Sequence, residues 1–246
     1  MASLFVSDLH LESAAMWAVD TFVAFLRGPA RAASRLYILG DLYEAWVGDD
    51  QLDDPGSMEA HVTRELAQLT ASGTTCYLLH GNRDFLLGAR FAATTKIVLL
   101  PDPVIAELEG TPTLLTHGDI LCTEDAAYQE LRSIVRTEPW QRRFLRLPRA
   151  TRIELASAAR AGSRAHMQRA QPMIMDVNER AVLAAFRASH TRRMIHGHTH
   201  RPAVHEHDVD GAPATRIVLD SWHERGSYLR VCNNAIESIS LPGAPE

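Results

Sequence analysis

Acidic, imidazole and amide side chains stand in short clusters along this chain, each directly after an apolar segment. Asp8 and His10 are two residues apart, so on a strand their side chains leave the same face and can converge on one ion. Alone, such a pair is more often a capping acid beside an exposed histidine. The same spacing recurs further along the chain, and the complete set of candidate ligands is Asp8, His10, Asp41, Asn82, His117, His198 and His200.

These candidate ligands are oxygen and imidazole groups without a thiolate, which suits a catalytic Mn, Fe, Mg or Zn site better than a structural zinc site. Seven ligands exceed what one ion with an open position can use, so they predict two neighbouring ions, with Asp41 as the natural bridge. Such a pair activates water at neutral pH and neutralises the charge that shifts during phosphoryl transfer.

The clusters follow five short apolar runs, which predict buried strands at 4–6, 36–39, 77–79, 114–115 and 194–195. In an open α/β sheet the carboxyl ends of such strands face one crevice, which would bring the clusters together. Helical periodicity is present at about 14–26, 59–70, 128–135 and 178–188. The pattern then changes to that of antiparallel strands, at 203–209, 215–219 and 228–231. The mixture predicts an α/β fold.

Length and composition favour one domain spanning 1–246, with a helical insertion at about 123–172 that is interrupted at Pro139 and Pro148. The three cysteines are far apart and odd in number, so we expect a reducing compartment, the cytoplasm. We expect no leader before the first strand, and no run approaches the roughly 20 apolar residues that span a bilayer.

The formal net charge of −5 disfavours a general nucleic-acid binder, which needs an excess of lysine and arginine. The charge is unevenly spread, because 126–170 contains ten arginines and three glutamates. This local excess of positive charge indicates an anionic partner for the insertion.

The motifs Asp-x-His, Gly-Asp, Gly-Asn-Arg-Asp, His-Gly-Asp and Gly-His-Thr-His, in this order, resemble the calcineurin-like metallophosphoesterase superfamily. That resemblance implies a sandwich of two mixed β-sheets flanked by helices, with the insertion as a helical cap. Longer matches resemble one branch of the superfamily, the bacterial diphosphatases that cleave UDP-2,3-diacylglucosamine in lipid A synthesis, and they fall at 5–11, 40–50, 80–86, 174–178 and 195–202.

By this resemblance, Asp8, His10, Asp41 and His200 would hold one manganese ion, and Asp41, Asn82, His117 and His198 a second. Water activated by the ions would attack, with no separate catalytic side chain. The products would be UMP and 2,3-diacylglucosamine 1-phosphate, formed at the anionic cytoplasmic face of the bacterial inner membrane. The resemblance also implies contacts with this nucleotide-linked glycolipid, from Asn82, Arg83, Asp125, Ser163 and His198.

Arg83 favours diphosphate cleavage independently. An arginine can clamp phosphate oxygens but cannot protonate a leaving group, and a phosphate monoester, with a second pKa of about 6, needs no such acid. The alternative is a surface arginine paired with Asp84. Asp125 has an alternative too, as an acid that only caps a helix. Met167 and Ala170 replace an Asn and a Lys that the branch usually offers to the substrate.

Two other functions are compatible with the same motifs. The substrate could be another nucleotide diphosphate or a phosphodiester, although the basic insertion disfavours this. The fold could instead be a binding scaffold without turnover, although a scaffold does not need all seven ligands. For the insertion, a lipid-binding cap and an ordinary amphipathic helical pair with solvated arginines are both open.

Overall fold

The computed structural model describes residues 2–169 and 176–244, with the side chains of 163–169 outside the described part. The side chains of the predicted substrate contact Ser163 and of the substituted position Met167 therefore lie outside the described part, as does the whole of Ala170.

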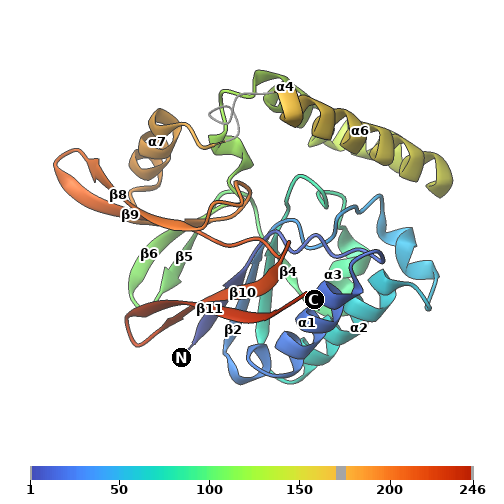
Figure 1. The fold of residues 1–246 in the computed structure, drawn as a ribbon, viewed down its shortest axis with the longest axis horizontal. Helices are drawn as coiled ribbons and strands as arrows, with labels where there is room; N and C mark the ends of the chain where they lie inside the picture. The colour runs from blue at the N-terminus through green and yellow to red at the C-terminus, as the bar shows by residue number, and fades with distance from the viewer. Residues whose placement is uncertain (1, 170–175, 245–246) are drawn as a thin grey trace.

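Two β-sheets pack face to face, and helices cover their outer faces (Figure 1). One sheet has the order β11 (Ala235–Gly243), β10 (Arg225–Cys232), β1 (Ser3–Val6), β2 (Arg35–Leu39), β3 (Thr75–Leu79) and β4 (Val98–Leu99). The other has the order β5 (Val104–Leu108), β6 (Thr111–Leu115), β7 (Arg193–His196), β9 (Ala212–Val218) and β8 (Ala203–Val209). Each sheet contains parallel and antiparallel pairs, which confirms the predicted fold class.

Helices on both sides of this sandwich close its two outer cores. The helices α1 (Met16–Arg27), α2 (Met58–Ala71) and α3 (Ala89–Thr95) pack on the first sheet. On the second sheet, α7 (Glu179–Ser189) packs through Val182 and Phe186. The insertion forms α4 (Ala126–Val135), α5 (Glu138–Leu145) and α6 (Arg149–Arg169). None of the described helices has the length and apolar character needed to cross a membrane.

Alternation along the strands explains why the runs are continuously apolar. In β1, Leu4 and Val6 join the core beneath the outer helices, whereas Phe5 joins the core between the sheets. In β7, Met194 packs toward α7 and Ile195 packs toward the first sheet. Both β1 and β7 are buried on both faces, so period-2 alternation in them separates two apolar sets instead of apolar from polar residues.

The polar clusters follow strands of both sheets. The expectation that all the clusters follow strands of a single open sheet is wrong, because β1, β2 and β3 belong to the first sheet and β6 and β7 belong to the second. The clusters nevertheless meet because the two parallel sets end at the same side of the sandwich. His117, after β6, donates from Nδ1 to the carbonyl oxygen of Leu39 at the end of β2, at 2.8 Å.

The insertion lies beyond this edge, with α4 and α6 on the opposite side of the view from α1 and α2 (Figure 1). The predicted interruptions are confirmed as helix starts, because Pro139 stands in the first turn of α5 and Pro148 directly precedes α6. We call α4, α5 and α6 the cap. Its assignment as an insertion of one domain stays a prediction.

A buried arginine anchors one end of the cap to the sandwich. Arg152 of α6 is only 3% exposed. Its guanidinium donates to both carboxylate oxygens of Asp50, to the carbonyl oxygen of Val47 and to that of Leu147. The bond to Asp50 lowers the pKa of that carboxyl. Charge-assisted bonds of this kind each contribute about 1.5–3 kcal/mol.

Replacing this anchor is expected to loosen the cap without unfolding the sandwich. The change Arg152→Met should cost about 2 kcal/mol of local stability, which corresponds to roughly 30-fold faster hydrogen exchange in α5 and α6. Exchange in β1, β2 and β3 should be unchanged. Arg149→Met is the matched control, because Arg149 donates to Asp50 only at its backbone oxygen and is exposed. Equal effects of the two changes would contradict the anchor.

Candidate active site

The turns that present the predicted ligands have an uncommon backbone conformation. Five of the predicted ligands have positive φ angles between 48° and 69°, in the left-handed region, and these are Asp8, His10, Asp41, His198 and His200. Such conformations cost of order 1–3 kcal/mol each for residues other than glycine and persist where surrounding structure enforces them, typically at functional sites. Their concentration on one edge of the sandwich marks that edge as the candidate site.

The first group of side chains surrounds the buried carboxylate of Asp8. Its Oδ1 atom lies 3.3 Å from His200 Nε2 and 4.0 Å from His10 Nε2. The two histidine Nε2 atoms are 3.4 Å apart. Asp41 Oδ2 lies 3.8 Å from His10 Nε2. Four potential ligand atoms thus point toward one another.

The second group shares Asp41 with the first. Asp41 Oδ2 is also 3.8 Å from His117 Nε2. Asn82 Oδ1 lies 3.0 Å from His117 Nε2 and 3.0 Å from His198 Nδ1. All seven predicted ligands therefore come together, in two groups that meet at one oxygen of Asp41. Their roles as ligands stay a prediction.

The chemistry of these groups fits divalent cations. Asp8 Oδ1 is buried and has no hydrogen-bond partner among the described residues, while Oδ2 accepts from the backbone amide of His198 at 2.8 Å. Asp41 is likewise divided, since Oδ1 accepts from the amide of Arg83 at 2.8 Å and Oδ2 faces the histidines. Each carboxylate is held through one oxygen and offers the other to the site. An unpaired buried carboxylate oxygen is costly, and a cation removes that cost.

Protons on the neighbouring imidazoles can balance part of the negative charge of these buried carboxylates. Burial alone would lower the pKa of His117, but the carboxylates of Asp41, Asp8 and Asp119 raise it to about 9. The pKa of His10 is also raised, because its bond to Glu44 and the nearby carboxylates outweigh burial. Burial and the neighbouring His117 lower the pKa of His198 to about 4. Cation binding to imidazole requires neutral rings, so it would release protons from His117.

A family model for calcineurin-like phosphoesterases matches residues 1–202 of this chain. The chain belongs to the calcineurin-like phosphoesterase family. A curated relative from Enterobacter sp. (strain 638), named UDP-2,3-diacylglucosamine hydrolase, is 45% identical over 98% of this chain and all of its own length. A relative of the same name from Salmonella typhi is 46% identical with the same coverage. A solved archaeal phosphodiesterase aligns with 98% of this chain and 100% of its own, at 13% identity and a TM-score of 0.49.

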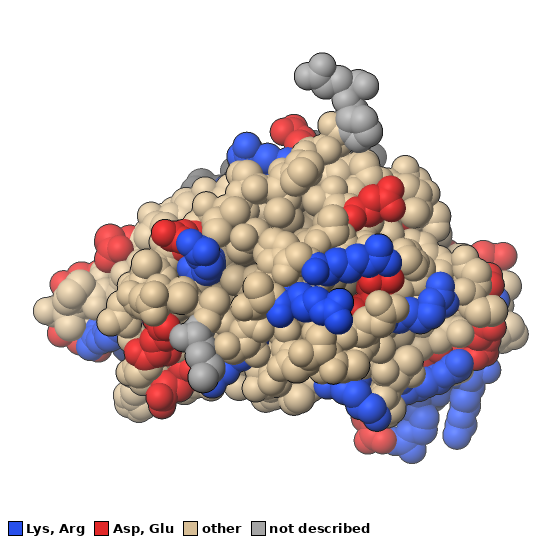
Figure 2. Space-filling model, turned by 90° about the horizontal axis from the view of Figure 1, so that it is seen from below, with Lys and Arg blue, Asp and Glu red and all other residues tan. Residues whose placement is uncertain are grey.

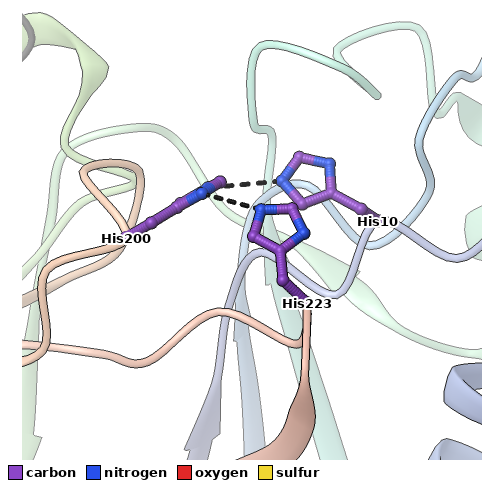
Figure 3. Close-up of side chains that lie close together, drawn as sticks. All are labelled: His10, His200 and His223. Atoms are coloured by element: carbon purple, nitrogen blue, oxygen red, sulfur yellow. Dashed lines mark hydrogen bonds between the residues drawn. The ribbon is translucent and has the colours of Figure 1, made fainter. Parts of the chain in front are cut away.

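Two residues of this phosphoesterase hold the outer nitrogens of the histidines in the first group. His10 donates from Nδ1 to Glu44 Oε2 at 2.9 Å, and His200 Nδ1 is bonded to His223 Nε2 at 3.0 Å. Figure 3 shows His10, His200 and His223 converging, with the His223 ring stacked on that of His10 at 5.5 Å. Such partners fix the orientation of ligating imidazoles.

Sequence reasoning missed both roles. Glu44 stood only within the matched segment 40–50, and His223 was not among the candidate site residues. The residue before His223, Trp222, is buried against Phe22 and Phe25. No spacing rule in the sequence links residue 223 to His200. The only signal for Glu44 would have been the general need of a ligating histidine for a carboxylate partner on its other ring nitrogen.

The structure tests the alternatives stated for Arg83, a surface pair with Asp84, and for Asp125, a helix cap. Arg83 is not paired with Asp84, so the surface-pair alternative is wrong: Asp84 is fully buried and accepts from the amides of Leu42 and Gly81. Asp125 caps α4 by accepting from the amide of Tyr128, which confirms the capping role. Both Arg83 and Asp125 also line a cavity beside the predicted ligands. Their contacts with substrate stay predictions.

The shared oxygen of Asp41 gives a direct test of the two-ion arrangement. Asp41→Ala is expected to remove both ions, because its carboxylate lies between the groups, whereas His10→Ala and His117→Ala should each deplete one. Elemental analysis of purified variants counts the ions per chain. Two retained ions in Asp41→Ala with near-normal turnover would contradict the bridge.

Proposed function

We propose that this chain hydrolyses the diphosphate bond of UDP-2,3-diacylglucosamine and releases UMP and 2,3-diacylglucosamine 1-phosphate, as a step of lipid A synthesis. Curated relatives of 45–46% identity over almost the whole chain carry the name of this hydrolase. The family supports phosphoester hydrolysis in general, and the relatives support the particular substrate.

One cavity carries the proposal. It has a volume of about 750 Å³ and reaches from the predicted ligands His10, Asp41 and His200 to the cap. Its cap side combines apolar residues, among them Leu131, Trp140, Phe144 and Leu155, with arginines such as Arg143 and Arg160. A cavity that has predicted ligands at one end, and apolar and cationic side chains on the cap side, matches a substrate that joins a diphosphate to acyl chains.

We propose two manganese ions as the cofactor, held by Asp8, His10, Asp41 and His200 on one side and by Asp41, Asn82, His117 and His198 on the other. Bound divalent ions of this kind supply a nucleophilic water at neutral pH and neutralise phosphoryl charge. The chain's own contribution is to fix the ligand atoms, since Asp8 and Asp41 are each tied to a backbone amide.

Arg83 is the candidate clamp on the diphosphate. Its side chain lines the cavity and is 18% exposed, and its buried Nε has no hydrogen-bond partner among the described residues. A guanidinium with a free donor can bind a phosphate oxygen without giving up an existing bond. Because arginine does not act as an acid, the leaving group must depart unprotonated, as a sugar phosphate does.

Heavy-oxygen labelling identifies which of the two phosphorus atoms the water attacks. If the sugar phosphate is the leaving group, hydrolysis in heavy-oxygen water places the label in UMP and none in 2,3-diacylglucosamine 1-phosphate, as mass spectrometry of both products would show. UMP incubated with enzyme alone controls for exchange. Label confined to the sugar phosphate would reject this geometry.

We further propose that the cap docks on the anionic cytoplasmic face of a bacterial inner membrane. Exposed Arg142, Arg146 and Arg149 accompany exposed Ile134 and Ile153, and basic residues near an anionic leaflet contribute roughly 1 kcal/mol each. Arg152 cannot take part, because it is buried against Asp50. On the side opposite the cap, acidic and basic side chains are interspersed (Figure 2).

Matched pairs of cap residues separate substrate binding from membrane docking. Leu131 and Leu155 line the cavity and are 50% and 48% exposed, whereas Ile134 and Ile153 do not line it and are 48% and 47% exposed. Leu131→Gln with Leu155→Gln should raise the KM for the diacylated nucleotide in detergent micelles about tenfold, from lost apolar contact. Ile134→Gln with Ile153→Gln should leave that KM unchanged and weaken binding to anionic vesicles.

Hydrolysis of a small artificial phosphodiester is the control for both pairs and should be unaffected. Equal changes of KM in the two pairs would contradict a lipid-binding cavity. Unchanged vesicle binding by the isoleucine pair would contradict the docking surface.

A further inference from the structure

We propose that Glu44 is a positioning residue that joins the first group of predicted ligands to a pair of arginines, Arg83 from the sandwich and Arg160 from the cap, which bracket a phosphate of the substrate. The inference deepens the proposed function and rests on it for the identity of the phosphate.

The two oxygens of Glu44 face different partners. Oε2 accepts from His10 Nδ1 at 2.9 Å, which orients the ring so that Nε2 faces Asp8 and Asp41. Oε1 lies 3.9 Å from Arg83 Nη1 and 3.9 Å from Arg160 Nε. Glu44 thus connects the predicted metal ligand His10 to the predicted phosphate clamp Arg83 and to Arg160 of α6.

The distances to the arginines are too long for hydrogen bonds. At 3.9 Å the carboxylate attracts both guanidiniums without satisfying their N–H groups. Arg83 Nε and Arg160 Nη1 are buried and have no hydrogen-bond partner among the described residues. Both residues line the cavity beside Asn82 and His198. Unsatisfied buried donors of cationic groups are costly, and an anion placed between them removes that cost.

A phosphate of the substrate's diphosphate, which carries one negative charge, fits this arrangement better than a neutral ligand does. Two guanidiniums against one carboxylate leave a net positive charge, which a phosphate completes. Arg160 is the only one of the three residues that the cap supplies, so its engagement requires α6 to lie over the predicted ligands. Arg160 is therefore a specificity-determining residue, and Glu44 places it.

The experiment combines metal affinity with a double-mutant cycle. Electron paramagnetic resonance of free Mn²⁺, titrated with metal-stripped protein, measures the affinity without substrate. Glu44→Gln keeps an oxygen that can accept from His10 Nδ1 and should retain the wild-type affinity within about threefold, whereas Glu44→Ala should weaken one of the two ions by about 10–100-fold.

The cycle tests the connection to the cap. Arg160→Met should raise the KM for the diacylated nucleotide about tenfold in the wild-type background, and less than about threefold in the Glu44→Gln background, because the charge of Glu44 no longer orients the Arg160 guanidinium there. Arg143→Met is the matched control. Arg143 lines the same cavity from α5, and in the described part of the chain no ion pair joins it to Glu44, so its effect should be equal in both backgrounds.

The outcomes separate this inference from the proposed function. A wild-type protein that binds no Mn²⁺ or does not cleave the diacylated nucleotide refutes the proposed function. If the wild type does both, equal metal affinities of the Gln and Ala variants refute the link to His10. Additive effects of Arg160→Met and Glu44→Gln refute the link to the cap.

Discussion

Burial of the Asp8 and Asp41 carboxylates at the meeting edge of two sheets is the constraint on which the site depends. Neither charge is solvated, and each is balanced through neighbouring imidazoles and one backbone amide. The turns adopt left-handed conformations to bring these groups together. Gly81 and Gly197 allow the closest approach, because a Cβ on either would collide with Asp41 or Asp8. Local strain is thus held by the surrounding sandwich.

The cap is tied to the same edge at both ends. Arg152 and Asp50 anchor α6, while Asp119, two residues beyond His117, anchors α4 by accepting from Tyr128 Oη at 2.5 Å and Arg132 Nε at 2.7 Å. Asp119 is fully buried and the nearby charge of His117 contributes to lowering its pKa against the effect of burial. The cap therefore depends electrostatically on the turns that present the ligands.

Sequence predicted the strands that matter for chemistry because their apolar runs end in polar clusters. The runs before Asp8, Asp41 and His117 are β1, β2 and β6, and their ends do meet. It did not predict β11, whose residues are mostly exposed and give no apolar period, or the seven-residue helix α3. The partners of ring nitrogens, such as Glu44 and His223, depend on side-chain orientation between distant segments, which spacing does not encode.

The predicted metal ligands and part of the substrate cavity come from different parts of the chain, the sandwich and the cap. This division explains how the same ligand arrangement can serve different substrates. The predicted ligands come from turns of the sandwich, where a substitution disturbs buried charge and backbone strain together. Part of the apolar lining comes from cap residues such as Leu131 and Leu155, which are half exposed and carry little of the fold. Substrate choice can therefore change through the cap at low cost to stability. Glu44 of the sandwich and Arg160 of the cap are paired, so this contact limits how independently the sandwich and the cap can vary in sequence.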